Sequence, residues 1–155
     1  MLKVGEQAPD FSLPDSTGRH RTLVGLLATG PLVLFFYPAD FTPICTAQAC
    51  MFRDRHAELA AAGVQVVGVS AQGQDSHHRF QTELQLPYPI LCDPHRIAIR
   101  KFAARWFGIP LPAITRRVTY LIDTQRTVRA RVLADLSASA HASILQEAMV
   151  LRDSA

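Results

Sequence analysis

The sequence predicts an α/β fold in which a central mixed β-sheet is flanked by helices. Residues 32–37 form an unbroken apolar run of strand length, which is typical of a strand covered on both faces of a sheet. Residues 64–69 form a second run, rich in β-branched side chains, and a helical segment separates the two. A strand, a helix and a strand in this order predict a right-handed crossover between parallel strands.

Turn-forming and helix-ending residues mark the boundaries of the elements that precede residues 64–69. Residues 1–31 are expected to hold only short extended pieces, with a turn at Asp15-Ser16-Thr17-Gly18. The first long helix is predicted from about Pro43 to Ala62, because Gly63 is a natural stop just past its end. Its apolar stripe is expected to contain Ala49, Phe52, Leu59 and Ala60.

The middle of the chain predicts two further helices around a short strand. A helix is expected from Ser76, which would cap it, to Gln85, and the prolines that follow end it before a strand at residues 90–92. Asp93-Pro94 is expected to begin another helix of about ten residues, ending near Trp106-Phe107-Gly108.

The last third predicts a hairpin and a terminal helix. Residues 118–122 and 127–133 are expected to pair, although the turn between them, residues 123–126, contains no glycine. A helix is expected to start near Ser137 or Ser139. Its inner face would carry Ile144, Leu145, Ala148 and Leu151. Together the elements predict a thioredoxin-like sandwich.

The stretch between the first strand and the first long helix contains the candidate reactive cysteine. Pro38 cannot donate to a sheet ladder and should end the strand. Thr42 is predicted as the N-cap of the helix, with Pro43 at its first position. Cys45 then lies in the first turn, where unpaired N–H groups and the positive end of the helix dipole stabilise a thiolate.

Cys50 follows Cys45 five residues later on the same predicted helix. On an ideal helix the α-carbons of two such residues are about 8.7 Å apart, whereas a disulfide needs them within roughly 7 Å. The two cysteines therefore cannot pair while the helix is intact. Either they never pair, or pairing unwinds the first turns of the helix.

Composition limits the class of protein. The chain has 155 residues, of which 48% are hydrophobic and 19% charged, so we expect one ordered domain over residues 1–155. Three cysteines do not make the disulfide framework of a secreted domain. The first residues lack an apolar signal core, and no apolar run approaches membrane-spanning length. We therefore expect a cytoplasmic protein without a membrane partner.

Charge and histidine spacing exclude other partners. The net charge of +3 comes mostly from arginines, but no aromatic side chains interleave with them, so we expect a solvated face and no nucleic acid. The histidines form no ligand pattern beyond the adjacent pair His77-His78, and neither CxxC nor HxxxH spacing occurs. We expect no metal and no other bound cofactor.

The pattern Pro38-x-x-x-Thr42-x-x-Cys45 resembles the active-site signature of the peroxiredoxins. Cys50, on the same helix, resembles the resolving cysteine of the peroxiredoxin Q, or bacterioferritin-comigratory, subfamily. Two further segments are similar to that family: residues 5–11 to its opening, and residues 117–123 to the strand that carries its active-site arginine. The resemblance thus runs through most of the chain.

The resemblance implies a role for each matched residue. Cys45 would be the peroxidatic nucleophile and Cys50 the resolving thiol. Thr42 would hydrogen-bond the peroxide, and Pro38 would shield the thiolate from water. The family register selects Arg117, rather than the neighbouring Arg116, as the pocket cation.

Simpler roles exist for some of these residues. Thr42 could be a helix cap and nothing more, and Pro38 only a strand terminator. Cys50 could be a core residue, since buried free cysteines are common. Cys92 has no motif support and is most simply a packing residue.

The resemblance implies a thiol-dependent peroxidase that acts on hydrogen peroxide and organic hydroperoxides, in antioxidant defence and redox homeostasis. Cys45 would become a sulfenic acid and then form a disulfide with Cys50, which thioredoxin or a similar dithiol reductant would reduce. We expect a monomer or a weak homodimer. The aromatic and apolar side chains Phe102, Trp106, Phe107 and Ile109 would either form a dimer patch or line the core and the pocket mouth.

Two other functions compete with this one. A general dithiol oxidoreductase on the same fold normally uses CxxC, whereas four residues separate Cys45 from Cys50. A non-catalytic module could use the three cysteines to bind copper or zinc, and metal analysis of the purified protein would discriminate it.

Overall fold

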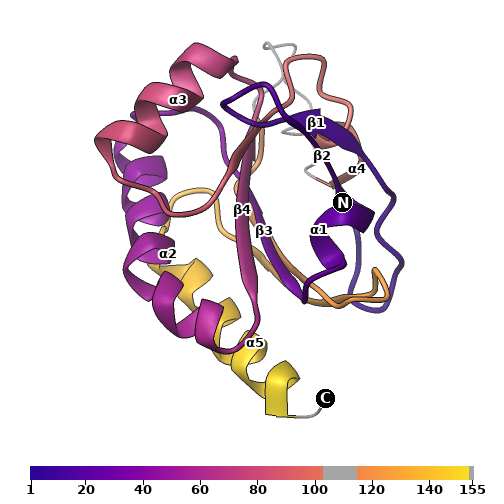
Figure 1. Cartoon of the computed structure of the whole chain (residues 1–155). Coiled ribbons are helices and arrows are strands. Elements are labelled where there is room, and N and C mark those ends of the chain that lie inside the picture. Colours follow the sequence, from indigo (N-terminus) through magenta and orange to yellow (C-terminus); the bar gives the residue numbers. More distant parts are fainter. Residues whose placement is uncertain (103–114, 154–155) are drawn as a thin grey trace.

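The computed structural model describes residues 1–102 and 115–153, and contains a five-stranded sheet, a two-stranded sheet and surrounding helices (Figure 1). The strands are β1 (Ser12–Pro14), β2 (His20–Thr22), β3 (Leu32–Phe36), β4 (Gln65–Ser70), β5 (Ile90–Cys92), β6 (Val118–Ile122) and β7 (Val128–Leu133). The helices are α1 (Leu23–Leu27), α2 (Pro43–Ala61), α3 (Gln74–Glu83), α4 (Ile99–Phe102), the 3₁₀ turn η1 (Ser139–Ala142) and α5 (Ser143–Asp153).

The large sheet is mixed, as the sequence predicts. Its order is β5-β4-β3-β6-β7, with β3, β4 and β5 mutually parallel and β6 and β7 antiparallel to their neighbours. β3 lies in the centre, and all five of its residues are buried. An unbroken apolar run is what a strand with no solvent-facing side requires.

Two hydrophobic clusters, one on each face of the sheet, form the core. Leu32, Leu34 and Phe36 of β3 join one cluster, whereas Val33 and Phe35 join the other, because successive side chains of a strand point to opposite faces. Figure 1 shows α2, α3 and α5 on one side of the sheet, and α1 with the β1–β2 hairpin on the other. The predicted sandwich, with helices on both faces, is confirmed.

One helix was not predicted, and the predicted start of another was wrong. α1 was not predicted, because five residues are too few to show a helical period; the Thr22 hydroxyl caps it by accepting the Gly25 N–H. α3 begins two residues before Ser76, with Gly73 as its N-cap. The Ser76 hydroxyl instead donates to Asp40 at 2.7 Å, so a tertiary contact replaces the expected cap.

The helix expected from Asp93-Pro94 begins only at Ile99. Asp93 does cap the segment, since its carboxylate accepts the N–H groups of Ile97, Ala98 and Ile99. However, Arg96 has a left-handed backbone (φ 57°), which interrupts a helix before it can run from Pro94. The predicted end near Trp106-Phe107-Gly108 lies outside the described residues.

The hairpin of β6 and β7 is confirmed, and its turn works without glycine. Arg126 takes the left-handed conformation (φ 66°) that glycine usually supplies. The Asp123 carboxylate compensates by accepting the N–H groups of Gln125 and Thr127, both at 2.9 Å.

The predicted inner faces of the helices are largely correct. Ala49, Phe52 and Leu59 of α2 are buried, but Ala60 is exposed, so its placement on the stripe was wrong. On α5 the buried residues are Ile144, Leu145 and Ala148, and Leu151 packs half-buried against them. In the part of the chain that the structure describes, no helix combines the length and apolarity needed to cross a bilayer.

Candidate active site

The loop between β3 and α2 places Cys45 as the sequence predicts. Thr42 occupies the N-cap with extended backbone (φ −77°, ψ 149°), and α2 begins at Pro43. Cys45 is the third helical residue and is buried, with 1% of its surface exposed. Phe41, directly before the cap, has a left-handed backbone (φ 63°), an uncommon conformation that marks a constrained loop.

The Thr42 side chain does not cap the helix. Its hydroxyl donates to the Ala39 carbonyl at 3.0 Å, inside the loop, while its own carbonyl accepts the Thr46 N–H. The predicted N-cap position is therefore right, but the predicted capping hydrogen bond is replaced by one that closes the loop. Pro38 is half-buried at the start of this loop.

Arg117 is the cation beside Cys45. Its Nη1 donates to the Cys45 Sγ at 3.2 Å and to the Gln48 Oε1 at 2.9 Å, and its Nε donates to the Asp135 carbonyl at 3.3 Å. The arginine is 3% exposed. A guanidinium in contact with a sulfur favours the thiolate, and burial strengthens the interaction because water screens it less.

Strand alternation explains why Arg117, and not Arg116, reaches the thiol. Arg117 precedes β6, whose residues Thr119 and Leu121 face α2, so with a period of two Arg117 faces α2 as well. Arg116 is directed elsewhere, and its guanidinium donates to the Asp135 carboxylate at 2.7 and 3.2 Å.

Asp135 is a site residue that the sequence did not single out. Burial alone would raise its pKa, but the side chain of Arg116, the backbone N–H of Arg117 and both positive charges outweigh this and hold the pKa below its usual value. The carboxylate therefore stays ionised and fixes the backbone from which Arg117 projects.

A second buried network fixes the loop itself. Asp40 accepts hydrogen bonds from the Tyr37 hydroxyl at 2.6 Å, from Ser76 at 2.7 Å and from the His77 Nδ1 at 2.7 Å. Burial raises the pKa of Asp40, but the hydrogen bonds from His77, Tyr37 and Ser76 outweigh it and leave the pKa below its usual value. This carboxylate connects the loop between β3 and α2 to α3, a link that no sequence motif indicated.

Asp40→Asn is expected to destabilise the protein by about 2–4 kcal/mol at pH 7, because two buried donors, Tyr37 and His77, and the half-buried Ser76 lose an ionised acceptor. The pKa of Asp40 is lowered from its ordinary value of 3.8, so this contribution is complete above that value and is lost as the pH falls through the lowered pKa. Urea unfolding at pH 7 and in acid measures the difference, which should shrink in acid.

The matched control for this prediction is Asp75→Asn, at an exposed carboxylate on α3. Its effect should stay within about 0.5 kcal/mol at both pH values. Equal effects of the two substitutions would contradict the anchoring role of Asp40.

All three cysteines are free thiols in this structure. Cys50 is half-buried within an unbroken α2, so the helix holds the two thiols in the arrangement that excludes a disulfide. The Tyr88 hydroxyl donates to the Ala49 carbonyl at 2.7 Å, next to Cys50. Burial, with the charges of Asp40 and Asp15 (the latter on the β1–β2 turn), raises the pKa of Cys92 to about 11, so this thiol is protonated and inert, in agreement with a packing residue.

The first of the four apolar and aromatic residues considered for a dimer patch lies in the core. Phe102 is fully buried and stacks on Phe36 with ring centroids 5.3 Å apart. Trp106, Phe107 and Ile109 lie outside the described residues. For Phe102 the core alternative is therefore correct.

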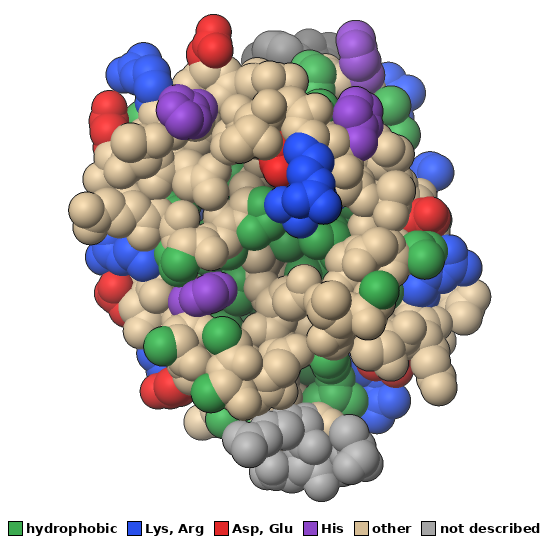
Figure 2. Space-filling view, in the orientation of Figure 1, with side chains coloured by type: hydrophobic (Ala, Val, Ile, Leu, Met, Phe, Trp, Pro, Cys, Tyr) green, Lys and Arg blue, Asp and Glu red, His purple; other side chains and the backbone are tan. Residues whose placement is uncertain are grey.

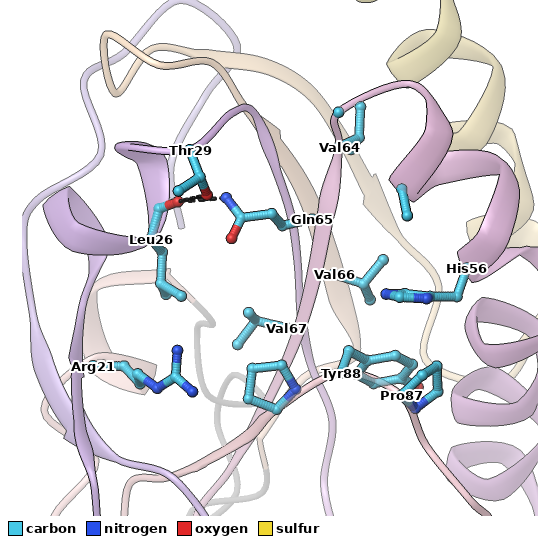
Figure 3. Close-up of a pocket in the computed structure, with 13 residues that line it drawn as sticks. Arg21, Leu26, Thr29, His56, Val64, Gln65, Val66, Val67, Pro87 and Tyr88 are labelled. Atoms are coloured by element: carbon cyan, nitrogen blue, oxygen red, sulfur yellow. Dashed lines mark hydrogen bonds between the residues drawn. The ribbon is translucent and has the colours of Figure 1, made fainter.

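The face shown in Figure 2 carries lysine and arginine side chains interspersed with acidic ones, rather than a single basic patch, and it is hollowed near its middle. One hollow, of about 330 Å³, lies along the edge of β4 and is bordered by Arg21, His56 and Gln65 (Figure 3). It lies at the N-terminal ends of the parallel strands, because Gln65 pairs with Leu32. Cys45 follows the opposite end of β3, so this hollow is no part of the candidate site.

Within residues 1–102 and 115–153, no group of three or more His, Cys, Asp or Glu side chains is arranged to hold a metal ion. The chemistry available at the site is that of a buried sulfur nucleophile at a helix start, with a guanidinium against it.

The sequence is similar to those of known proteins. The model of the AhpC/TSA family matches residues 4–131. A Mycobacterium tuberculosis protein described as a candidate peroxiredoxin is 38% identical over 143 residues, covering 91% of this chain and 92% of that protein. The chloroplastic peroxiredoxin Q of Arabidopsis thaliana is 39% identical over 128 residues, which is 81% of this chain and 56% of the plant protein.

Solved structures show the same fold. The crystal structure of the peroxidoxin BcpB from Mycobacterium tuberculosis superposes with a TM-score of 0.89 at 35% identity, over 97% of this chain and 98% of that one. Peroxiredoxin Q of Xanthomonas campestris has a TM-score of 0.82 at 25% identity, over 97% and 96% of the two chains.

Proposed function

We propose that Cys45 is the reacting thiol of this chain, which belongs to the AhpC/TSA family, among the peroxiredoxins of the Q type. Proteins of this family reduce peroxides with a thiol. The observation that supports this most is the contact of the Arg117 Nη1 with the Cys45 Sγ at 3.2 Å, at the start of a helix. Among the three cysteines, only Cys45 combines a helix N-terminus with a buried cation.

The proposed first step is attack of the Cys45 thiolate on the terminal oxygen of a hydroperoxide. A sulfur–oxygen bond forms while the oxygen–oxygen bond breaks, which gives a sulfenic acid and releases water or an alcohol. Arg117 offsets the negative charge that grows on the departing oxygen. The Thr42 oxygen, whose proton is engaged by Ala39, is available to accept a hydrogen bond from the peroxide, and Pro38 would limit water access.

The proposed second step joins Cys45 to Cys50. The Cys50 thiol attacks the sulfenic sulfur, forms a disulfide and releases water. Since the intact helix keeps the two residues apart, its first turns must unwind before this bond forms. Thioredoxin or a similar dithiol would then reduce the disulfide by thiol exchange and return the helix to its starting state.

Hydrogen peroxide and organic hydroperoxides are the proposed substrates, in antioxidant defence. The test is consumption of hydrogen peroxide and of cumene hydroperoxide by the reduced protein, coupled to a thioredoxin and thioredoxin reductase system. Oxidation of the coupled system that depends on both the protein and peroxide supports the proposal. Peroxide left unconsumed by the fully reduced protein would refute it.

Cys50→Ser is expected to leave the first oxidation of Cys45 unchanged but to lower thioredoxin-supported turnover more than about tenfold, because the sulfenic acid lacks its partner thiol. Single-turnover oxidation and steady-state cycling, measured on the same preparation, separate the two effects. Ala47→Ser, at an exposed position of the same helix, is the control and should change neither rate. Undiminished cycling of Cys50→Ser would show that another thiol resolves the sulfenic acid.

We further propose that residues 1–155 act as one domain, as a monomer or weak homodimer, in the cytoplasm. The family match over residues 4–131 supports the single domain. The Arabidopsis relative is named chloroplastic. No observation in the described residues favours the dithiol oxidoreductase or the metal-binding module over the peroxidase.

A further inference from the structure

A chain of hydrogen bonds between buried side chains runs from the guanidinium at the thiol to a histidine. The Arg117 Nη1 donates to the Gln48 Oε1 at 2.9 Å, and the Gln48 Nε2 donates to the Thr119 Oγ1 at 3.3 Å. The Thr119 Oγ1 lies 2.7 Å from the His141 Nδ1, and the His141 Nε2 lies 3.0 Å from the Ala134 carbonyl oxygen. Gln48, Thr119 and His141 are all fully buried.

The direction of every hydrogen bond follows from the two ends of this chain. A guanidinium only donates, so Gln48 must present its Oε1 to Arg117 and its Nε2 to Thr119. A backbone carbonyl only accepts, so the His141 Nε2 carries a proton. In a neutral imidazole the Nδ1 is then an acceptor, to which the Thr119 hydroxyl donates a hydrogen bond.

The surroundings of His141 favour this neutral form. Burial lowers the pKa of His141 below the usual value, and the positive charge of Arg117 lowers it further. The hydrogen bond to the Ala134 carbonyl and the charge of Asp135 raise the pKa, but burial outweighs them. The imidazole therefore retains an acceptor at Nδ1 at neutral pH. A protonated ring would donate at Nδ1 and leave the Thr119 hydroxyl proton without its present acceptor.

We propose that His141 is a positioning residue for Arg117, acting through Thr119 and Gln48. The imidazole orients the hydroxyl, the hydroxyl orients the amide, and the amide oxygen holds the guanidinium against the Cys45 sulfur. This inference rests on the proposed role of Cys45. It extends the site to η1, whose buried residue His141 lies 24 residues beyond Arg117 in the sequence.

The test uses two pairs of variants and the rate at which iodoacetamide alkylates Cys45, followed by mass spectrometry of the Cys45 peptide. Thr119→Val and His141→Leu each remove the hydrogen bond between Thr119 and His141, so Gln48 no longer holds Arg117 in place. Alkylation at pH 6 should then slow about tenfold, because the Cys45 thiolate loses a fixed cation. Thr119→Ser keeps a hydroxyl, and His141→Asn keeps an acceptor near the Nδ1 position. These two should stay within about threefold of wild type.

A merely structural role predicts a different pattern. In that case alkylation would slow only as far as the melting temperature of each variant falls. Slowing that tracks the melting temperature, or equal rates in all four variants, overturns the proposal. Slowing confined to Thr119→Val and His141→Leu, and larger than their loss of stability accounts for, supports it.

One measurement needs no variant. Nitrogen-15 NMR of wild-type protein at pH 7 should show His141 as the neutral tautomer with the proton on Nε2, and a proton on Nδ1 would overturn the proposal. Neither alkylation nor NMR depends on peroxide turnover. A wild type that fails to consume peroxide refutes the proposed function alone, and an alkylation rate insensitive to all four variants in an active enzyme refutes the positioning role alone.

Discussion

Cys45→Ser is expected to abolish peroxide consumption, with a loss of at least about a thousandfold, because a hydroxyl is not ionised at neutral pH and is a far weaker nucleophile than a thiolate. The substitution is nearly isosteric, and the position is buried beside Arg117, so the fold should persist. The measurement is the rate of peroxide loss with fully reduced protein, together with a far-ultraviolet circular dichroism spectrum to establish folding.

Cys92→Ser is the matched control, since it also exchanges a buried thiol for a hydroxyl. Its sulfur lies at the end of β5, and its pKa of about 11 keeps it protonated, so peroxide consumption should remain within about threefold of wild type. Activity retained by Cys45→Ser but lost in Cys50→Ser would move the nucleophile to Cys50 and refute the assignment of both residues.

The local structure around Cys45 could be predicted because each residue there acts on its own neighbours. Pro38 lacks an N–H, Thr42 suits an N-cap and Pro43 suits a first helical position, and α2 begins where these rules place it. The same rules failed at α1 and α4. Both elements are short, and at α4 an unexpected left-handed residue, Arg96, decides where the helix can start.

The rest of the site could not be predicted from local rules, because its partners are distant in sequence. Gln48 and Thr119 are 71 residues apart, and Asp40 and His77 are 37 apart. One signal was available for Gln48, which stands three residues after Cys45 and so shares its helix face. Nothing comparable marks His141, which meets Thr119 only after η1 packs on the sheet.

The structure also constrains how the proposed redox cycle could run. The helix start proposed to stabilise the Cys45 thiolate belongs to the same helix that keeps Cys50 away. In the proposed cycle, activation and resolution therefore need opposite states of α2. Unwinding of α2 as far as Ala49 would break the hydrogen bond from the Tyr88 hydroxyl to the Ala49 carbonyl, so this bond adds to the cost of the proposed unwinding.

Arg117→Ala is expected to slow oxidation of Cys45 by hydrogen peroxide about a hundredfold to a thousandfold, as loss of a preorganised charge at a reacting centre does. The guanidinium is 3% exposed and touches the sulfur, so water cannot replace it without entering the core. Single-turnover oxidation of the reduced protein, quenched and followed by intact mass, measures the rate directly.

Arg116→Ala tests the choice between the two neighbouring arginines. Its guanidinium pairs with the Asp135 carboxylate, so its loss should cost about 1 kcal/mol of stability while the oxidation rate stays within about fivefold of wild type. Some slowing is expected because the Asp135 carboxylate, which Arg116 holds, also accepts the backbone N–H of Arg117 at 3.1 Å and so orients that residue. Should Arg116→Ala cause the larger loss of rate, the period-two argument for β6 would fail, and the pocket cation would have to be reassigned to Arg116.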